Sequence, residues 1–315
     1  MDDARKLISI VVPAFNEQEN VRVLYNSVTA VMKVIEDKYD HEIVFTDNCS
    51  EDRTFEVLEE IAAADNRVRV IRFSKNFGFQ RSIFTGYLNA RGAAAIQLDC
   101  DLQDPPELIL DFIRKWEEGY RIVYGVRRSR KEAWWITRLR SSFYYLIDLL
   151  SEDRLPLNAG DFRLIDRVIL DELKKVDDQT PYLRGTIAAM GFKQTGIEYD
   201  RAERLRGESK FPLRRMIGFA VDGILNHSVI PLRVATFIGL ATSLITLLSI
   251  PVYLIGRLIL AKDWPAGFAT TTILMLLSIS LNALFLGIIG EYLGRIYKQV
   301  KRRPITIVEK SLNQP

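Results

Sequence analysis

The chain has 315 residues, enough for one sizeable domain and a smaller second part. Its 43 basic and 40 acidic residues leave a net charge of +3, which is too modest to indicate a nucleic-acid partner. Two histidines, far apart in sequence, give little support to a histidine-rich zinc site. The two cysteines, Cys49 and Cys100, are expected as reduced thiols.

The first third of the chain alternates apolar runs with amphipathic segments. This βαβ alternation predicts a parallel sheet with right-handed crossovers. Neither a dinucleotide-binding glycine motif nor a P-loop occurs in it. We predict strands over residues 7–13, 42–46 and 68–73, and helices over residues 21–37 and 54–64 and in a segment that ends at Tyr87.

An acidic stretch, residues 97–107, follows an apolar run over residues 91–96 that we expect to be a buried strand. Asp99 and Asp101 therefore lie at the carboxyl end of a strand, where open α/β sheets bind ligands. Two residues apart, they would point to one face of a regular strand and could bind a hard cation, Mg²⁺ or Mn²⁺. A polar strand exit that leads into the next helix is the simpler alternative.

Beyond this stretch we predict a helix over residues 108–118 and a strand over residues 121–126. A basic run, residues 127–131, then leads into an aromatic stretch over residues 134–147. Such a stretch is suited to a membrane interface, but packing in a core explains it equally well.

The last third of the chain contains two uncharged runs, residues 234–255 and 266–290. Each exceeds the roughly 20 residues that a helix needs to cross a bilayer, so we expect two transmembrane helices within residues 232–296. Before them, residues 211–231 predict an amphipathic helix that lies in the membrane interface or packs beneath the N-terminal domain.

Basic residues flank these runs on both sides. The positive-inside rule therefore predicts a multi-pass protein of the inner membrane, with the N-terminal domain and a basic tail, residues 297–315, in the cytoplasm. The flanking residues are Arg214, Arg215, Arg233, Lys298, Lys301, Arg302 and Arg303.

Four segments, in this order and spacing, resemble the family 2 glycosyltransferases: residues 12–17, 47–54, 76–78 and 99–107. The resemblance implies a GT-A fold over residues 1–210, a Rossmann-like α/β domain that binds a nucleotide-diphospho-sugar donor. It also implies a divalent metal, Mg²⁺ or Mn²⁺, as the cofactor.

Individual roles follow from the same resemblance. Asp101 would hold the metal that bridges the diphosphate, and Asp161 matches the position of a catalytic acceptor-site carboxylate. Asp47 would bind the nucleotide. Asn48 stands where a second acidic residue is usual and Cys49 where glycine is usual, so Asn48 is either a nucleotide contact or a turn residue. The other donor-site residues implied are Pro13, Phe15, Glu17 and Asp99.

The second half of the chain resembles polyisoprenyl-phosphate glycosyltransferases, and the bactoprenol glucosyltransferase branch most of all. Residues 160–164, 207–210 and 290–297 carry this likeness. It implies that a hexose, with UDP-glucose as the expected donor, is transferred with inversion to undecaprenyl phosphate at the cytoplasmic face of the membrane. Candidates to receive the lipid phosphate are Arg206, Ser209 and Lys210.

Other activities stay open. The same motifs would serve GDP-mannose, UDP-N-acetylglucosamine, UDP-galactose or a modified arabinose. A processive polysaccharide synthase would need a Gln-x-x-Arg-Trp motif, which the sequence lacks. A non-catalytic nucleotide-sugar-binding membrane protein is favoured only by Asn48 and Cys49. The choice of Mg²⁺ or Mn²⁺ and the formation of a homo-oligomer are also open.

Overall fold

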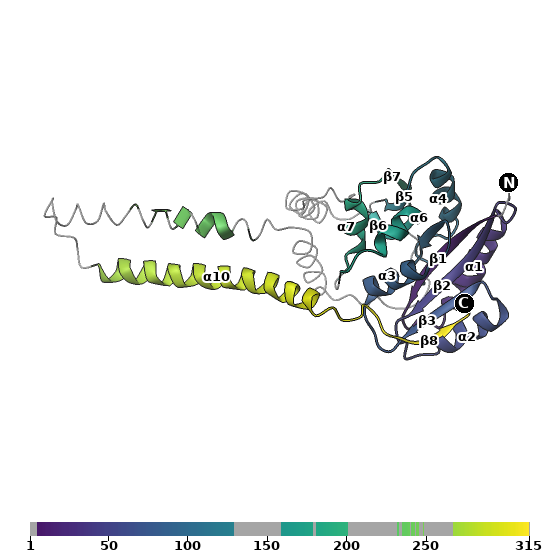
Figure 1. The fold of residues 1–315 in the computed structure, drawn as a ribbon, viewed down its shortest axis with the longest axis horizontal. Helices are drawn as coiled ribbons and strands as arrows, with labels where there is room; N and C mark the ends of the chain where they lie inside the picture. Colours follow the sequence, from purple (N-terminus) through teal and green to yellow (C-terminus); the bar gives the residue numbers. More distant parts are fainter. Residues whose placement is uncertain are drawn as a thin grey trace. The chain divides into compact units, whose positions relative to one another are not determined.

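The structure is a computed structural model in which two compact units can be distinguished (Figure 1). The first unit comprises Met1–Asp148, Asp153–Met216 and Arg303–Pro315, and the second comprises Leu149–Glu152 and Ile217–Arg302. The structure describes residues 5–128, 159–178, 181–200 and 267–314, and scattered positions between 232 and 248.

The first unit is an α/β domain whose early elements agree with the sequence predictions. In chain order its elements are β1 (Lys6–Ala14), α1 (Val21–Lys33), β2 (Tyr39–Asp47), α2 (Thr54–Ala64), β3 (Val68–Phe73), α3 (Phe79–Asn89), β4 (Ala94–Gln97), α4 (Leu108–Glu117), β5 (Ile122–Arg127), β6 (Ala159–Asp166), α6 (Arg167–Leu173), α7 (Leu183–Ala189), β7 (Gln194–Tyr199) and β8 (Val308–Leu312).

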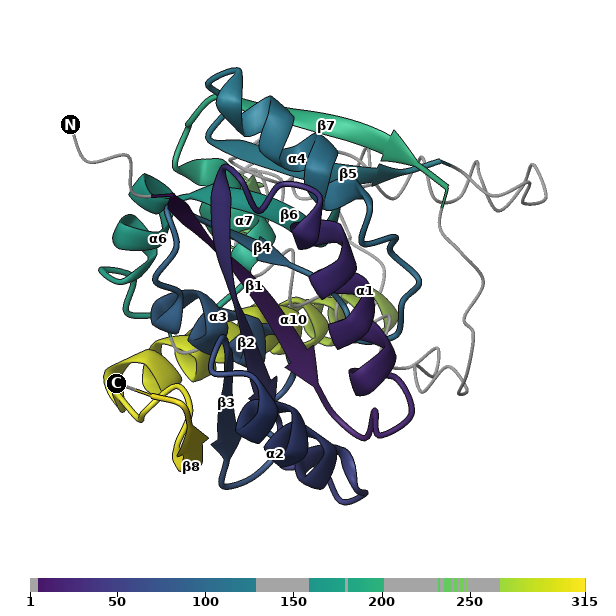
Figure 2. The same ribbon diagram turned by 90° about the vertical axis from the view of Figure 1, so that its right-hand side faces the viewer.

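Its strands form one sheet in the order β7-β5-β6-β4-β1-β2-β3-β8 (Figure 2). β1 is parallel to β2 and β4, and β2 is parallel to β3, as the βαβ alternation predicts. Beyond these strands the sheet is mixed, because β6 is antiparallel to β4 and β5, and β8 is antiparallel to β3. The alternation concerns only strands joined by a crossover helix, whereas most of the chain separates β3 from β8.

Helices cover both faces of the sheet, which explains why the central strands are apolar without alternation. On one face, Ile8, Ile10 and Val12 of β1 pack in the same cluster as residues of α1, α2 and α4. On the other, Val11 packs in the same cluster as residues of α3, α6 and α7. All four β1 side chains are fully buried.

A close backbone approach shifts the start of β4 from residue 91 to Ala94. A Cβ on Gly92 would lie 2.6 Å from the backbone nitrogen of Ser9 and 2.8 Å from the carbonyl oxygen of Leu7. Only glycine fits at position 92, because a side chain there would collide with the backbone of β1. β4 begins two residues later, at Ala94.

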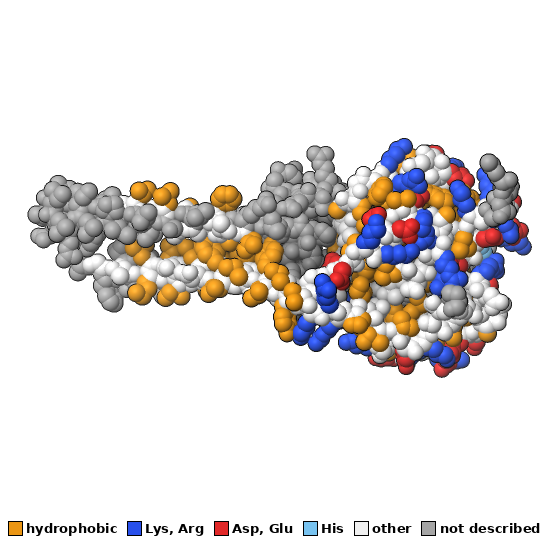
Figure 3. Space-filling view, in the orientation of Figure 1, with side chains coloured by type: hydrophobic (Ala, Val, Ile, Leu, Met, Phe, Trp, Pro, Cys, Tyr) orange, Lys and Arg blue, Asp and Glu red, His pale blue; other side chains and the backbone are white. Residues whose placement is uncertain are grey.

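The described part of the second unit is dominated by α10 (Phe268–Val300), a 33-residue helix. At 1.5 Å per residue it is about 50 Å long, more than the hydrocarbon core of a bilayer. Leu277–Gly294 is the one stretch of the described chain that forms a helix long and apolar enough to cross a membrane. Its apolar side chains are exposed, as Leu286 (67%) and Leu293 (62%) illustrate (Figure 3).

The second of the two expected spans thus coincides with a helix of suitable length and composition. The first expected span, residues 234–255, is described only at scattered helical positions. The expected interfacial helix over residues 211–231 and the aromatic stretch over residues 134–147 lie outside the described residues.

The C-terminal segment differs from the expected basic tail. Within residues 297–315 the chain forms β8, which pairs with β3 at the edge of the sheet that contains β1. The carbonyl oxygen of Ile307 also accepts a hydrogen bond from the backbone N–H of Ser74 (3.0 Å). The segment after α10 is therefore part of the first unit.

Three non-glycine residues adopt positive φ angles in the loops that follow β1, β2 and β4. They are Asn16 (φ 55°), Cys49 (φ 61°) and Leu102 (φ 56°). Such angles strain an L-residue, and they occur preferentially at functional sites. The angle at Cys49 also explains why glycine suits this position.

We expect replacement of Cys49 by valine to lower the free energy of unfolding by about 1–2 kcal/mol, because a β-branched side chain tolerates positive φ poorly. Cys49→Gly should not lower it, because glycine adopts this angle without steric strain. Denaturation of the purified protein in detergent measures both variants. Equal stability of the valine and glycine variants would contradict the role of the backbone angle.

Candidate active site

The candidate site lies at the carboxyl edge of the central strands. Pro13, an expected donor-site residue, is buried in β1 and aligned with Thr46, and Ala14 is aligned with Asp47. On the other side of β1, Val11 is aligned with Gln97 at the end of β4. Parallel pairing therefore brings the motifs after β1, β2 and β4 to one edge.

Hydrogen bonds join the loop after β1 to the loop after β2. The backbone N–H of Asn16 donates to Ser50 Oγ (3.0 Å), and Asn16 Oδ1 accepts from the backbone N–H of Glu51 (2.8 Å). The backbone N–H of Glu17 donates to Thr54 Oγ1 (2.8 Å). These bonds fix the path of the segment that holds Phe15 and Glu17, two expected donor-site residues that are both partly exposed.

Asp47 is fully buried at the end of β2. Its Oδ1 accepts a hydrogen bond from the backbone N–H of Ser50 (3.1 Å), whereas its Oδ2 has no hydrogen-bond partner. Arg72 of β3 lies 3.6 Å from Oδ2. Burial raises the pKa of Asp47, while the bonds from Ser50 and the charge of Arg72 oppose this rise.

The contacts of Asn48 explain why this position holds an amide rather than a carboxylate. Asn48 Oδ1 accepts from the backbone N–H of Phe77 (2.8 Å), and Asn48 Nδ2 donates to Asn76 Oδ1 (3.0 Å). Asn76 Oδ1 also accepts from the backbone N–H of Gly78 (2.9 Å). An aspartate at position 48 could accept but not donate, so the amide joins the loops after β2 and β3.

The two acidic residues after β4 do not lie in a strand. β4 ends at Gln97, so the expected alternation of side chains in a strand does not orient Asp99 and Asp101. Asp99 Oδ1 accepts from Gln97 Nε2 (2.7 Å), and Asp101 Oδ1 accepts from the backbone N–H of Gln103 (3.2 Å). A compact turn, beside the strained Leu102, holds both carboxylates.

Negative charge is concentrated around Asp99. Burial, followed by the charges of Asp104, Asp161 and Asp101, raises the pKa of Asp99 to about 7. The described residues contain no group of three or more histidine, cysteine, aspartate or glutamate side chains arranged to hold a metal ion. The carboxylates of Asp99 and Asp101 are nevertheless hard oxygen donors, in a place where a cation would relieve repulsion.

Asp161 reaches the site through antiparallel pairing. β6 aligns Arg163 with Gln97 of β4, so Asp161, two residues earlier, continues past the end of β4. Arg184, at the start of α7, binds the carboxylate of Asp161 through Nε (2.9 Å) and Nη2 (2.6 Å), and Gln80 Nε2 lies at 3.4 Å. Burial alone would raise the pKa of Asp161, but the charge and hydrogen bonds of Arg184 lower it.

A second polar cluster surrounds Asp104, which is fully buried. Its Oδ1 accepts from the hydroxyl of Tyr199 (2.5 Å), and its Oδ2 lies 3.3 Å from Arg127 Nη2. Arg127 Nε also donates to the Tyr199 hydroxyl (3.2 Å). This cluster fixes the end of the acidic stretch against β5 and β7.

Sequence reasoning did not assign roles to the partners of these carboxylates. None of them lies within a motif, and each meets its carboxylate only through the pairing of distant strands and helices. A search for single basic residues at strand ends would have selected two of them, Arg72 and Arg127. The unassigned partners are Arg72, Gln80, Arg127, Arg184 and Tyr199. The proposed acceptor residues Arg206, Ser209 and Lys210 lie outside the described residues.

Comparison with known proteins places this geometry in a family. The family described as "Glycosyl transferase family 2" matches residues 9–174. An uncharacterized glycosyltransferase, YkcC, of Bacillus subtilis is 41% identical over 304 residues, which cover 96% of this chain and 93% of the relative. An SfII prophage-derived bactoprenol glucosyl transferase of Shigella flexneri is 34% identical over 96% of this chain and 98% of its own length.

Among solved structures, the mannosyltransferase PcManGT of Pyrobaculum calidifontis, in complex with GDP-Man and Mn²⁺, is 16% identical with a TM-score of 0.49. The likeness covers 96% of this chain and 88% of that protein. The match of the family to more than half of the chain, the two relatives and the mixed sheet agree on a GT-A-like domain. The chain belongs to glycosyltransferase family 2 and is a glycosyltransferase.

Proposed function

We propose that this enzyme transfers a hexose from a nucleotide-diphosphate sugar, with UDP-glucose as the first candidate, to a polyprenyl phosphate at the cytoplasmic face of a membrane. One observation carries the proposal: the buried Oδ2 of Asp47, which lacks a hydrogen bond, lies at the same sheet edge as the carboxylates of Asp99, Asp101 and Asp161. The Shigella flexneri relative, named a bactoprenol glucosyl transferase, supports the lipid acceptor and the choice of glucose.

Asp47 supports the nucleotide part of the donor. A buried acceptor without a partner costs about 1–3 kcal/mol, and an N–H or O–H group of a base or ribose would satisfy Asp47 Oδ2. Pro13, Phe15 and Glu17 would line this pocket. We assign Asn48 to shaping the pocket rather than to contacting the nucleotide, because both of its side-chain polar atoms already bind neighbouring loops.

Asp99 and Asp101 support a divalent metal, Mg²⁺ or Mn²⁺. Mg²⁺ is commonly held by one or two carboxylates, with phosphate oxygens and water as the remaining ligands, so two aspartates are sufficient. When bound, such an ion would stabilise the negative charge that grows on the departing diphosphate. The charge crowding around Asp99 favours a cation at this place.

The acceptor needs no strong general base. The second pKa of a phosphate monoester is near 6, so the attacking oxygen is largely ionised at neutral pH. In-line attack would form the bond from this oxygen to the anomeric carbon while the bond to the diphosphate breaks, with inversion. Asp161, bound by Arg184, would then position the sugar or the acceptor rather than remove a proton.

The proposed acceptor-phosphate residues are Arg206, Ser209 and Lys210. Guanidinium and ammonium groups suit phosphate, and in the sequence these residues directly precede the expected interfacial helix. A lipid phosphate anchored by its chain in the bilayer would meet them close to the membrane surface.

The sheet supports a multi-pass arrangement. β1 and β8 belong to the same sheet, although residues 217–302 of the second unit lie between β8 and the earlier parts of the first unit in the chain. A chain that leaves one side of a membrane and returns to the same folded domain must cross it an even number of times. We therefore propose two spans, with α10 as the second.

The test of this function uses the purified protein in detergent with Mg²⁺, undecaprenyl phosphate and a panel of nucleotide sugars. Mass spectrometry should detect a lipid product that is one hexose heavier, with UDP-glucose as the preferred donor. A product with a different sugar would correct the donor alone. A polymer, or binding without turnover, would overturn the acceptor.

Asp101→Ala should reduce transfer at least about 100-fold, because loss of a metal ligand removes several kcal/mol of charge stabilisation. Asp40→Ala is the matched control, because Asp40 is exposed near the amino end of β2. Initial rates at saturating Mg²⁺, with circular dichroism as a check of folding, measure both variants. Near-normal transfer by a folded Asp101→Ala variant would refute the metal assignment.

Asp99→Asn should stabilise the ligand-free protein at pH 8. The pKa of Asp99 is raised to about 7 in the folded state, so the stability associated with its protonated form is lost as the pH rises from about 4 through 7. The melting temperature of the variant should therefore exceed that of the wild type most at pH 8, and the difference should shrink toward pH 4.

Thermal unfolding in detergent between pH 4 and pH 8, without metal, measures this difference. Asp40→Asn serves as the control and should show no such trend. Added Mg²⁺ should stabilise the wild type more than the Asp99→Asn variant. A difference that does not depend on pH would contradict the charge crowding.

A further inference from the structure

The segment over residues 305–314 contacts the rest of the first unit at several points. β8 pairs with β3, and before it Thr306 Oγ1 forms a hydrogen bond with Thr85 Oγ1 of α3 (2.9 Å). After it, Asn313 Nδ2 donates to the carbonyl oxygens of Ala62 (2.7 Å) and Val68 (2.8 Å). These contacts hold β8 against β3, with a shift of the pairing register between Arg72 and Phe73.

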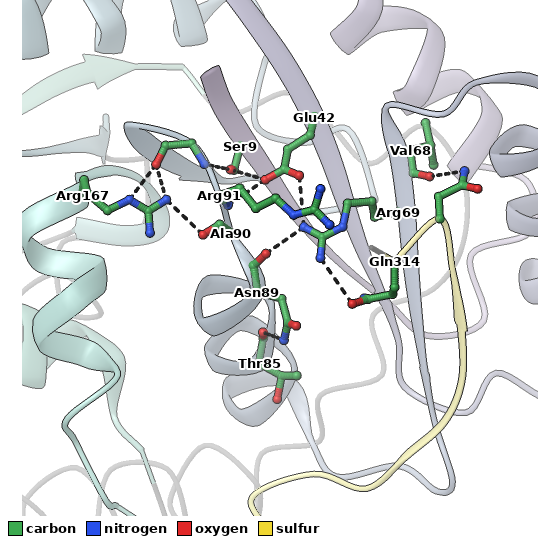
Figure 4. Close-up of polar contacts among 12 residues, drawn as sticks. Ser9, Glu42, Val68, Arg69, Thr85, Asn89, Ala90, Arg91, Arg167 and Gln314 are labelled. Carbon is green, nitrogen blue, oxygen red and sulfur yellow. Dashed lines mark hydrogen bonds and ion pairs between the residues drawn. The ribbon is translucent and has the colours of Figure 1, made fainter. Parts of the chain in front are cut away.

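The end of the chain also contacts a buried ion pair inside the domain. Arg69 of β3 lies 3.0 Å from Glu42 of β2, and both side chains are almost fully buried. Gln314 Oε1 lies 3.4 Å from Arg69 Nη2, on the side opposite Glu42 (Figure 4). Residues 305–314, which include β8, are therefore an integral part of the first unit.

One contact connects this strand to the candidate donor site. Arg72 of β3 lies between two carboxylates: its Nη1 is 3.6 Å from Asp47 Oδ2, and its Nε donates to Glu309 Oε2 of β8 (3.3 Å). Its guanidinium carbon lies 4.4 Å from the centre of the Phe55 ring, which supports the flat face of the group. Three elements thus orient a single arginine.

The orientation of Arg72 affects the protonation state of Asp47. The side chain of Asp47 is fully buried, and its Oδ2 has no hydrogen-bond partner. Burial favours the neutral form of this carboxyl group, and the charge of Arg72 favours the ionised form. When Asp47 is ionised both of its oxygens are strong acceptors, whereas in the protonated form one of them carries a donating O–H.

We propose that Arg72 and Glu309 are positioning residues of the donor site, and that the strand after the membrane helix completes this site. Glu309 holds Arg72 beside Asp47 Oδ2, and Arg72 prepares Asp47 to bind the nucleotide. This inference rests on the proposed function, because it takes Asp47 as a nucleotide contact. It makes the C-terminal strand a determinant of donor affinity.

A purely structural role of β8 predicts a different result. If the strand only covers the edge of the sheet, removal of the Glu309 charge would affect thermal stability but not the affinity for the donor. The positioning role predicts an increase in donor KM with little change in kcat at saturating donor. The division between KM and kcat therefore separates the two roles.

The experiment compares full-length variants in detergent. Glu309→Gln should raise the donor KM and the Kd for UDP by about 2- to 5-fold, as expected for a half-exposed ion pair. Glu309→Lys should raise them further, because it places a positive charge beside Arg72. Arg72→Ala should raise them at least about 10-fold, with partial rescue by Arg72→Lys, because the ammonium group restores the charge but not the planar geometry.

Lys310→Gln is the matched control. Lys310 lies on the same strand as Glu309, is aligned with Arg72 and lies 5.5 Å from the centre of the Phe55 ring, but its ion pair is with Glu59, so loss of its charge should leave the donor KM and the Kd for UDP unchanged. The measurements are donor titrations of transfer at saturating polyprenyl phosphate, and calorimetric binding of UDP with Mg²⁺. If the wild type uses another donor, its nucleoside diphosphate replaces UDP.

The outcomes separate this inference from the proposed function. A wild type that turns over a nucleotide sugar, with Glu309 variants that bind it equally well, overturns the positioning role alone. Equal effects of Glu309→Gln and Lys310→Gln on KM overturn it as well. A wild type that neither binds nor uses any nucleotide sugar overturns the proposed function and this inference together.

Discussion

The parallel pairing of β1 with β2 and β4 is the constraint on which the catalytic domain depends. It places the ends of three strands side by side, with Ala14 aligned with Asp47 and Val11 aligned with Gln97. Each loop beyond these ends contains a residue with a positive φ angle. Strain of this kind persists only where surrounding contacts determine the backbone, and the hydrogen bonds between the first two loops supply such contacts.

The carboxylates at this edge of the sheet differ in how their negative charge is compensated. Asp161 is bound by Arg184, Asp104 by Arg127 and the hydroxyl of Tyr199, and Asp47 has Arg72 nearby. Asp99 accepts its hydrogen bond from the neutral amide of Gln97, and the neighbouring carboxylates raise its pKa. Arginines thus lie beside Asp47, Asp104 and Asp161, and the raised pKa of Asp99 makes the turn after β4 a favourable place for an added cation.

The C-terminal strand, β8, forms the edge of the sheet beside β3. An antiparallel strand at the edge of the sheet satisfies backbone groups of β3 that would otherwise be unpaired, and it protects that edge. Because α10 directly precedes this segment in the chain, the helix that is suited to a membrane is covalently joined to the strand beside Arg72. The chain therefore passes from the apolar helix to the edge of the sheet within residues 301–307.

The sequence by itself determined much of this protein. Apolar runs and helical periods located the strands and helices from β1 to β5, because both are local properties. The order of four motifs identified the family, and the second of two long uncharged runs coincides with the apolar helix α10. At Asn48 and Cys49 the sequence showed only that the residues differ from those usual in the family. The structure explains them through a shared amide network and a positive φ angle.

Only the tertiary structure decided which residues meet. The pairing of Asp161 with Arg184 depends on the antiparallel register of β6 and on the position of α7, and neither leaves a periodic pattern in the sequence. β8 is short, mostly exposed and polar apart from its two terminal residues, so no alternating apolar pattern marks it as a strand. Its partner strand lies more than two hundred residues earlier in the chain, as the contact from Arg72 to Glu309 shows. Local patterns cannot encode such a contact, because it forms only when the sheet is assembled.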